Sequence, residues 1–437
     1  MSLLKLLKSK NTGIQLFYLI RFASTFLMAV LLGQVLGDFE IIGKFEKFLL
    51  IKHIYTGFWT AALMNALFPF YLRRPADRQS DAISAALVLF LIFGVIFGLL
   101  AYFTGAYSVP GLSQTAYLLI AIVLFLESLG QLSEQMLWLK NKTPWILVTG
   151  VVQYGLFVLM AFLPLYWGYS IEQMLGLLVV WSGLKVLLTL FLLKAFYVVK
   201  LKLIYLKSFF VMAAPILFSL FMNKITEQTD SIIINYFFDE AAFSIYRYGA
   251  RELPFVIILT AVMNVTQSGS MAKRVQQGEQ KSALQALKSS ALKLMHFAFP
   301  LSMVLLFLSP YLYPLVFGTP FKDAAFYFNI YLLLLVSRTL FAQTVCVGFN
   351  QHRILYLSSF VELVVNFILS YLAALYVGME AVAAVTVIVH YLEKGILVVY
   401  LKRKKIALSL FHPLKWWAFY SLVLWFIFGI TYLIHFR

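Results

Sequence analysis

Residues 207–266 read KSFFVMAAPILFSLFMNKITEQTDSIIINYFFDEAAFSIYRYGARELPFVIILTAVMNVT. They form two apolar segments, 207–237 and 241–266, separated only by Phe238-Asp239-Glu240. Each segment is long enough to cross a bilayer as a helix, which requires about twenty residues. The stretch therefore predicts an antiparallel transmembrane hairpin, around which the rest of the chain is organised.

Both arms of this hairpin carry ionisable or amide side chains, at Lys224, Glu227, Gln228 and Asp230 and at Arg247, Arg251 and Glu252. Charged side chains are costly in lipid, so they are expected to face protein or water. Counted from Asp239, Glu227 and Arg251 lie equally far along their arms, and Asp230 and Arg247 differ by one residue. Equal helical rise therefore predicts a Glu227–Arg251 pair and an Asp230–Arg247 pair, either static or exchanging partners.

The composition of the whole chain is that of a polytopic membrane protein. Of its 437 residues, 62% are hydrophobic and only 12% are charged, whereas soluble proteins have about a quarter charged residues. The single cysteine, Cys346, excludes an internal disulfide and a cysteine-based metal cluster. No cofactor and no metal site are predicted.

Thirteen apolar segments, each of about twenty residues or more, follow one another along the chain. They lie at 12–36, 47–70, 82–103, 113–137, 143–163, 171–194, 208–237, 241–266, 289–311, 324–348, 354–377, 381–401 and 414–435. The predicted fold is therefore all-α, with about thirteen transmembrane helices. Its expected domains are a six-helix N-terminal lobe at 1–205, a six-helix C-terminal lobe at 206–405 and an additional transmembrane helix at 406–437.

The basic residues between these segments predict the orientation of the chain. Clusters such as Arg73-Arg74, Lys273-Arg274 and residues 402–405 fall on one side, and about four basic residues fall on the other. The positive-inside rule places the rich side in the cytoplasm, so the N-terminus is expected inside and the C-terminus outside. These loops account for the net charge of +17, and they predict contact with membrane lipids rather than with nucleic acid.

A short internal repeat supports two related lobes. Thr60-Ala-Ala-Leu-Met-Asn65 resembles Thr260-Ala-Val-Met-Asn264, and a basic pair follows each segment. Six intervening helices would return the chain to the same side of the membrane. The two lobes are therefore predicted to be parallel repeats with a transport path between them.

Further polar residues interrupt other predicted spans. Two stripes have helical spacing, Glu127, Gln131, Glu134 and Gln135 in one span and Ser358, Glu362, Asn366 and Ser370 in another, and isolated cations are Arg21, Lys52, Lys185 and Arg338. Helix–helix bonding and snorkelling are the favoured interpretation for Glu134, Lys185 and Lys394. A water-filled path is favoured for the costly charges Arg21, Glu227, Asp230, Arg247, Arg251, Arg338 and Glu362. Tyr246 and Tyr248 beside the arginines either pack or stack on sugars.

Several motifs resemble those of multidrug/oligosaccharidyl-lipid/polysaccharide exporters. Val35-Leu-Gly-Asp-Phe-Glu-Ile-Ile-Gly-Lys-Phe45 is similar to the G-x-x-E-x-x-G-x-aromatic element after their first helix. Ala214-Pro215-Ile, Asp230-Ser-Ile-Ile-Ile and Phe237-Phe-Asp-Glu-Ala-Ala-Phe-Ser-Ile-Tyr246 resemble the seventh helix and following turn of Wzx-type flippases of O-antigen. Leu315-Val-Phe-Gly318 with Ala324-Ala325 resembles their ninth-to-tenth connection. Two departures are Ser244, where the family usually has Gly, and an odd number of helices.

The resemblance implies an alternating-access flippase, not an enzyme, that carries undecaprenyl-pyrophosphate-linked oligosaccharide to the outer leaflet of a bacterial plasma membrane. Glycan polymerases would be candidate partners in polysaccharide or lipopolysaccharide biosynthesis. Arginine can bond two phosphate oxygens, so the expected substrate-binding residues are Arg21, Arg247, Arg251, Arg338 and Tyr248. The expected coupling-ion or gating residues are Lys224, Glu227, Asp230 and Glu362.

The alternative function is a cation-coupled multidrug exporter of the same superfamily. In it, Glu227, Asp230 or Glu362 would bind the coupling ion or a cationic drug. A membrane-embedded glycan polymerase or ligase is disfavoured, because the predicted outer loops are too short to carry a catalytic domain.

Overall fold

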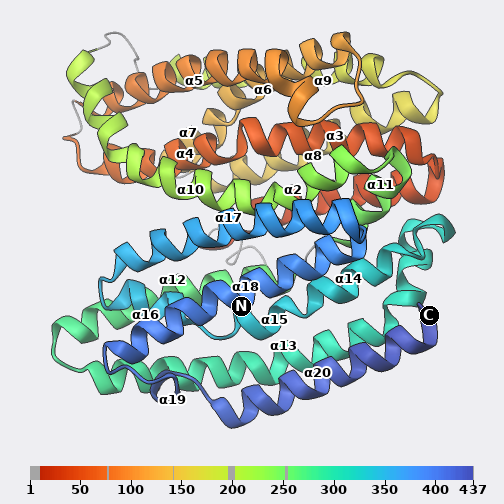
Figure 1. The fold of residues 1–437 in the computed structure, drawn as a ribbon. Coiled ribbons are helices and arrows are strands. Elements are labelled where there is room, and N and C mark those ends of the chain that lie inside the picture. The colour runs from red at the N-terminus through yellow and green to blue at the C-terminus, as the bar shows by residue number, and fades with distance from the viewer. Residues whose placement is uncertain (1–9, 76–77, 141, 195–201, 251–253, 437) are drawn as a thin grey trace. The chain divides into compact units, whose positions relative to one another are not determined.

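The computed structural model describes residues 10–75, 78–140, 142–194, 202–250 and 254–436, and these residues form helices joined by short connections (Figure 1). The chain divides into two compact units, unit 1 at Met1–Gln228 and unit 2 at Thr229–Arg437. The domain limits 1–205, 206–405 and 406–437 stay a prediction.

The described part of unit 1 begins with a long helix that ends in a short π-helical turn, and eight further helices follow. They are α2 (Lys10–Leu31), η1 (Leu32–Leu36), α3 (Phe39–Tyr55), α4 (Gly57–Leu72), α5 (Gln79–Ser108), α6 (Gln114–Gly130), α7 (Leu132–Leu139), α8 (Thr143–Tyr166), α9 (Ile171–Leu193) and most of α10 (Leu203–Phe237). Within unit 1, α6 packs between α5 and α9, and α2 packs against α8.

Unit 2 contains the end of α10 and the remaining helices. They are α11 (Glu240–Gly249), α12 (Pro254–Gln276), α13 (Gln280–Phe317), the 3-10 helix η4 (Thr319–Phe321), α14 (Ala324–Leu332), α15 (Leu334–Arg338), α16 (Ala342–Gly348), α17 (His352–Tyr376), α18 (Met379–Arg403), α19 (Leu408–Phe411) and α20 (Leu414–His435). Within unit 2, α17 pairs with α18, and α13 packs against α12 and α20.

Eleven candidate membrane spans, defined by length and composition, are found among the described residues. They agree with eleven of the thirteen predicted spans, and the all-α membrane fold is confirmed. The other two predicted spans are each divided between two helices. Residues 47–70 belong to α3 and α4, which meet at Thr56, and residues 241–266 belong to α11 and α12.

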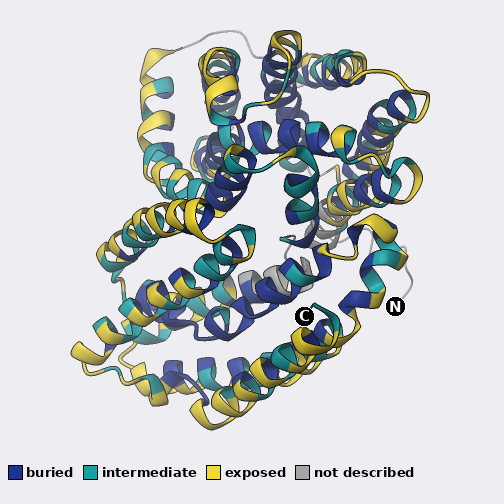
Figure 2. Cartoon of the chain, turned by 45° about the vertical axis from the view of Figure 1, so that its right-hand side comes forward, coloured by how far each residue is buried: buried dark blue, intermediate teal, exposed yellow. Residues whose placement is uncertain are grey.

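Most helices have a buried and an exposed face, and many exposed side chains are large and apolar (Figure 2). Phe103, Leu315 and Leu422 are each more than half exposed. An apolar outer surface of this kind suits lipid rather than water. Inside unit 1, the largest fully buried side chains include Trp59 and Trp181.

The motifs that resemble the exporter family have local structural reasons. Gly37 adopts a positive φ of 62°, which favours glycine, and so ends the π-helical turn after α2. Asp38 then caps α3 by accepting hydrogen bonds from the amides of Glu40 and Ile41. Ser244, which departs from the family's usual glycine, is buried and donates to the carbonyl of Glu240 at 2.7 Å inside α11.

Candidate functional site

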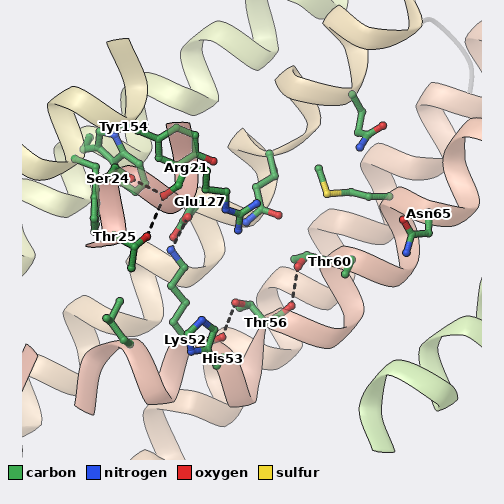
Figure 3. Close-up of a pocket in the computed structure, with 18 residues that line it drawn as sticks. Arg21, Ser24, Thr25, Lys52, His53, Thr56, Thr60, Asn65, Glu127 and Tyr154 are labelled. Atoms are coloured by element: carbon green, nitrogen blue, oxygen red, sulfur yellow. Dashed lines mark hydrogen bonds and ion pairs between the residues drawn. The ribbon is translucent and has the colours of Figure 1, made fainter. Parts of the chain in front are cut away.

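A pocket of about 250 Å³ lies inside unit 1 and is lined by residues of α2, α3, α4, α6, α7, α8 and α9. Its polar lining consists of Arg21, Ser24, Thr25, Lys52, His53, Thr56, Thr60, Asn65, Glu127, Gln131, Gln135 and Tyr154. Figure 3 shows Lys52 reaching from α3 towards Glu127 on α6. The pocket therefore collects charged, hydroxyl and amide groups inside an apolar protein.

The central contact of this pocket is an ion pair. Lys52 Nζ lies 2.7 Å from Glu127 Oε1, and the two side chains are 17% and 5% exposed. The second carboxylate oxygen, Glu127 Oε2, is buried and has no hydrogen-bond partner among the described residues. The guanidinium of Arg21 belongs to the same lining, and its backbone carbonyl accepts from Ser24 and Thr25. One carboxylate thus accompanies two cations at this pocket.

A second buried ion pair lies among the helices beside the pocket. Lys185 Nζ is 3.6 Å from Glu134 Oε1 and 4.8 Å from the ring centroid of Trp181. Tyr154 donates a hydrogen bond of 3.3 Å to the same oxygen of Glu134. Because Lys185 is buried, the interpretation of this residue as helix–helix bonding agrees with the structure, and snorkelling to the surface does not.

Two helix interruptions border the pocket. Thr56 separates α3 from α4, and Gln131 separates α6 from α7, and both residues line the pocket. The Thr56 hydroxyl donates to the carbonyl of Lys52 at 2.8 Å, and Thr60 donates to the carbonyl of Thr56 at 2.8 Å. Irregular backbone at membrane depth is tolerated where it is buried in protein or lines a water-filled cavity. The break in the second predicted span therefore coincides with the pocket.

A buried carboxylate, Asp230 on α10, forms the polar centre of unit 2. Its Oδ2 accepts from Thr386 at 2.6 Å, from Tyr246 at 3.3 Å and from Tyr331, and its Oδ1 accepts from Asn366 at 3.4 Å. All four partners are neutral. Hydrogen bonds to an ionised acceptor are stronger than neutral ones, so this cage stabilises the carboxylate without a cation.

The predicted Asp230–Arg247 ion pair is therefore wrong. Arg247 Nη1 donates instead to the hydroxyl of Ser231 at 2.9 Å. Equal helical rise matches only the depth of two residues, and on α11 the side chain of Tyr246, next to Arg247, is the one that reaches Asp230. Arg251, the predicted partner of Glu227, lies outside the described residues. Glu227 pairs with Lys224 at 2.5 Å, one turn away on α10.

The remaining predicted residues are distributed over unit 2. Tyr248 is completely buried and stacks on Phe321 with ring centroids 4.1 Å apart, so in this conformation its ring is not open to a ligand. Glu362 Oε1 lies 2.8 Å from His390 Nδ1. Arg338 is half-buried at the end of α15. Within unit 2, the structure thus gathers Asp230 with neutral groups.

Several site residues were missing from the predicted site. Lys52 and Glu127 could have been found, because each is a charge inside an apolar span. Lys224, which was among the predicted coupling-ion or gating residues, also lies near the pocket, since a Cβ placed on Gly57 would be 3.9 Å from its Cδ. Thr386 and Tyr331 gave no such signal, because single hydroxyl groups are common in transmembrane helices.

Solved structures of membrane transporters share this fold. The lipid II flippase MurJ, in an inward closed conformation, aligns with a TM-score of 0.69 and 17% identity over 97% of this chain and 93% of that chain. An inward-facing multidrug resistance transporter of the MATE family aligns with a TM-score of 0.64 and 11% identity over 88% and 94% of the two chains. A superfamily transporter from Pyrococcus furiosus aligns with a TM-score of 0.56 and 14% identity over 93% and 98%. At these identities the likeness concerns the fold.

The fold and the eleven candidate spans define a multi-pass membrane protein with the fold of these transporters. A sequence profile described as polysaccharide biosynthesis protein matches residues 73–326, more than half of the chain, so the protein belongs to that family. This family and the shared fold agree with the resemblance of its motifs to those of multidrug/oligosaccharidyl-lipid/polysaccharide exporters. No curated protein sequence matches the chain.

Proposed function

We propose that this transporter is a flippase for polyprenyl-pyrophosphate-linked oligosaccharide. The observation that carries the proposal is the pocket of unit 1, where Arg21 and Lys52 lie inside an apolar protein of the polysaccharide biosynthesis family. A pyrophosphate requires cations where water is scarce, and a guanidinium can bond two of its oxygens. Hydroxyl and amide groups of the same lining, such as Thr60 and Asn65, can bond sugar hydroxyls.

The ion pair in the pocket gives Lys52 a defined state before substrate arrives. Glu127 neutralises the charge of Lys52. When an anionic headgroup binds, it replaces Glu127 as the partner of the Lys52 ammonium. This exchange keeps the ammonium paired throughout the cycle, because a lone charge in a dry site is costly. The Glu127 carboxylate also selects for ligands of high negative charge, since a ligand with a single weak negative charge competes poorly with it for Lys52.

The proposed energy source is a cation that binds at Asp230. Its neutral cage allows the carboxylate to gain or lose a positive charge without leaving a protein cation unpaired. The proposed setting is a bacterial plasma membrane with the N-terminus in the cytoplasm and the C-terminus outside, as the basic loops predict. Undecaprenyl is the expected polyprenyl carrier, O-antigen-type glycan the expected cargo, and glycan polymerases the expected partners.

The test of the flippase uses a strain that lacks the protein. Deletion should cause lipid-linked oligosaccharide to accumulate and surface glycan to disappear, and the wild-type chain should restore both. Arg21→Ala should fail to restore surface glycan, and Arg21→Lys should restore it in part, because lysine keeps the charge but not the fork. Arg353→Ala, at an exposed residue at the start of α17, is the control and should behave as the wild type.

Asp230→Asn tests the coupling role separately. Asparagine preserves the size of the side chain and much of its hydrogen bonding, so the variant should reach the membrane but transport should fall to background. Glu40→Gln, at an exposed carboxylate paired with Lys44, is the control and should remain active. Full activity of a normally expressed Asp230→Asn variant would remove the coupling role and leave the pocket proposal intact.

A cation-coupled multidrug exporter is the second candidate function. The buried carboxylates Glu127 and Asp230 favour it, because a cationic drug needs an anionic site. The same deletion strain separates the two functions. Altered drug sensitivity without accumulated lipid-linked glycan would favour the exporter.

A further inference from the structure

Three polar contacts follow one another along the paired helices α17 and α18. At the first level, Asn366 and Thr386 both bond Asp230. At the second level, Glu362 lies 2.8 Å from His390. At the third level, Ser358 donates to Glu393 at 3.3 Å. The residues descend on α17 as 366, 362 and 358 and rise on α18 as 386, 390 and 393, as two antiparallel helices require.

This spacing places the levels one helical turn apart. Four residues of α-helix correspond to a rise of about 6 Å. A gap of that size is too long for a direct hydrogen bond, but one water molecule can bridge it. Asp230 therefore has a titratable pair on the next turn of the same two helices that supply part of its cage.

The middle level is the most accessible of the three. The side chain of His390 is 23% exposed and that of Glu362 is 12% exposed, whereas Asp230 and Glu393 are both buried. Glu362 occupies Nδ1 of the imidazole, and Nε2 has no hydrogen-bond partner among the described side chains. The contact at Nδ1 thus orients the ring, and Nε2 is the nitrogen that can exchange protons.

We infer that His390, oriented by Glu362, is the proton-transfer group that serves Asp230. A hydronium ion protonates the imidazole at Nε2 and becomes water, and the imidazolium then releases that proton from Nε2 through one bridging water to the Asp230 carboxylate, while Nδ1–H stays bonded to Glu362. The histidine returns to its neutral form, and Asp230 becomes a carboxylic acid. The reverse sequence discharges the proton. The inference rests on the proposed coupling role of Asp230 and specifies that the coupling cation is a proton.

Histidine suits this step because its charge changes near neutral pH, between the ranges of a carboxyl group and an ammonium. The helices packed against α18 bring Glu362 of α17 to His390 and Tyr331 of α14 to Asp230, and the neighbouring α15 and α16 carry Arg338 and Cys346. On α18 itself, Glu393 and Lys394 form an ion pair of 2.6 Å. Lys394 is thereby neutralised, which leaves Glu362 as the anion in contact with the imidazole.

The test follows the protonation of Asp230 directly. Purified full-length protein in lipid nanodiscs receives a light-triggered release of protons, and time-resolved infrared spectroscopy records the stretch of the protonated carboxyl group. The Asp230 band is the one that Asp230→Asn removes. We expect it to rise at least about tenfold more slowly in His390→Gln and in Glu362→Gln, because a positioned acid or base is lost. Glutamine retains hydrogen bonding, which favours correct folding in both variants.

The control and a rescue complete the experiment. His352→Gln, at an exposed histidine on α17, should leave the rate unchanged. Added imidazole should restore the rate in His390→Gln, which a purely structural role would not explain. An unchanged rate in His390→Gln overturns the inference, as does an Asp230 band that never appears at any pH at which the protein stays folded. If Asp230→Asn abolishes transport while the rate in His390→Gln is normal, only the proton-transfer role is rejected.

Discussion

Glu127 and Asp230 are both buried carboxylates, but different groups neutralise them. In unit 1, Lys52 supplies a full positive charge at 2.7 Å from Glu127. In unit 2, two tyrosines, a threonine and an asparagine supply neutral donors to Asp230. Removing Glu127 leaves a buried ammonium uncompensated, whereas removing the charge of Asp230 leaves only dipoles. This difference makes Asp230 the more suitable residue for repeated charge exchange.

The first residue-scale prediction separates a structural ion pair from a substrate contact. Glu127→Gln alone should lower the free energy of unfolding by about 3–5 kcal/mol, because Lys52 loses its partner. The double variant Lys52→Gln with Glu127→Gln should regain most of that stability and still not bind the headgroup, because the cation is gone. Thermal unfolding in detergent and calorimetric binding of inorganic pyrophosphate measure the two effects.

Pyrophosphate binding that survives in the double variant would show that the pair is only scaffold. The matched control is Lys202→Gln with Asp81→Asn, whose ion pair of 3.3 Å includes a half-exposed lysine outside the pocket and should contribute about 1 kcal/mol or less to stability. That control should retain pyrophosphate binding.

At the scale of the elements, the connection between α19 and α20 contains a buried histidine outside the candidate spans. Burial, together with the positive charge of Lys288, lowers the pKa of His412 from its ordinary value of 6.5 to about 4. Neither ring nitrogen has a partner among the described residues. The folded protein thus holds this imidazole neutral, against the ring of Trp417 at 5.9 Å.

His412 predicts a loss of stability in acid. The folded pKa is the lower one, so unfolding takes up a proton between pH 6.5 and about 4, and the free energy of unfolding falls over that range by up to about 3 kcal/mol. His412→Leu should remove this contribution at little cost near pH 7.5, because the leucine buries no polar atom. Melting temperatures of both proteins from pH 7.5 to 4.5 test the prediction, and parallel curves would contradict it.

Close approach of two helices sets a second element-scale prediction. A Cβ at Gly249 would lie 2.6 Å from Cβ of Tyr327 and would also meet the carbonyl of Ala324, so α11 and α14 would have to separate. Gly249→Ala should therefore destabilise the protein by about 1–3 kcal/mol. Gly395→Ala in α18, where nothing lies within 4 Å, is the matched control and should be neutral or stabilising. The melting temperatures of both variants and of the wild type test this prediction. An equal change in Gly249→Ala and Gly395→Ala would exclude the steric explanation.

At the scale of the whole molecule, hydropathy was sufficient for the class of fold and for eleven spans, because lipid imposes long apolar helices on any such chain. It did not locate the end of α3 before Thr56 or the end of α11 at Gly249, because a helix can end inside an apolar segment without changing the mean hydropathy of that segment. The site was foreseen in part for the same reason. Arg21, Asp230 and Glu362 were named as candidates because a charged side chain inside a membrane span is costly. The neutral partners of Asp230 gave no such signal, and they come from α11, α14, α17 and α18. Only the three-dimensional fold brings these helices together.

The last prediction concerns the orientation of the entire chain. Each divided segment, α3 with α4 and α11 with α12, ends near a basic cluster, Arg73-Arg74 in one case and Lys273-Arg274 in the other. If each divided segment crosses the membrane once, the number of crossings stays odd, and the positive-inside rule keeps the N-terminus in the cytoplasm. A reporter enzyme that is active only outside, fused after Arg437, should then be active, and one fused after Lys404 should be silent. The same fusion after Arg437 in a chain that lacks residues 414–435 should become silent, because one crossing has been removed. Activity from a cytoplasm-specific reporter after Arg437 in the full chain would show that α20 does not span the membrane.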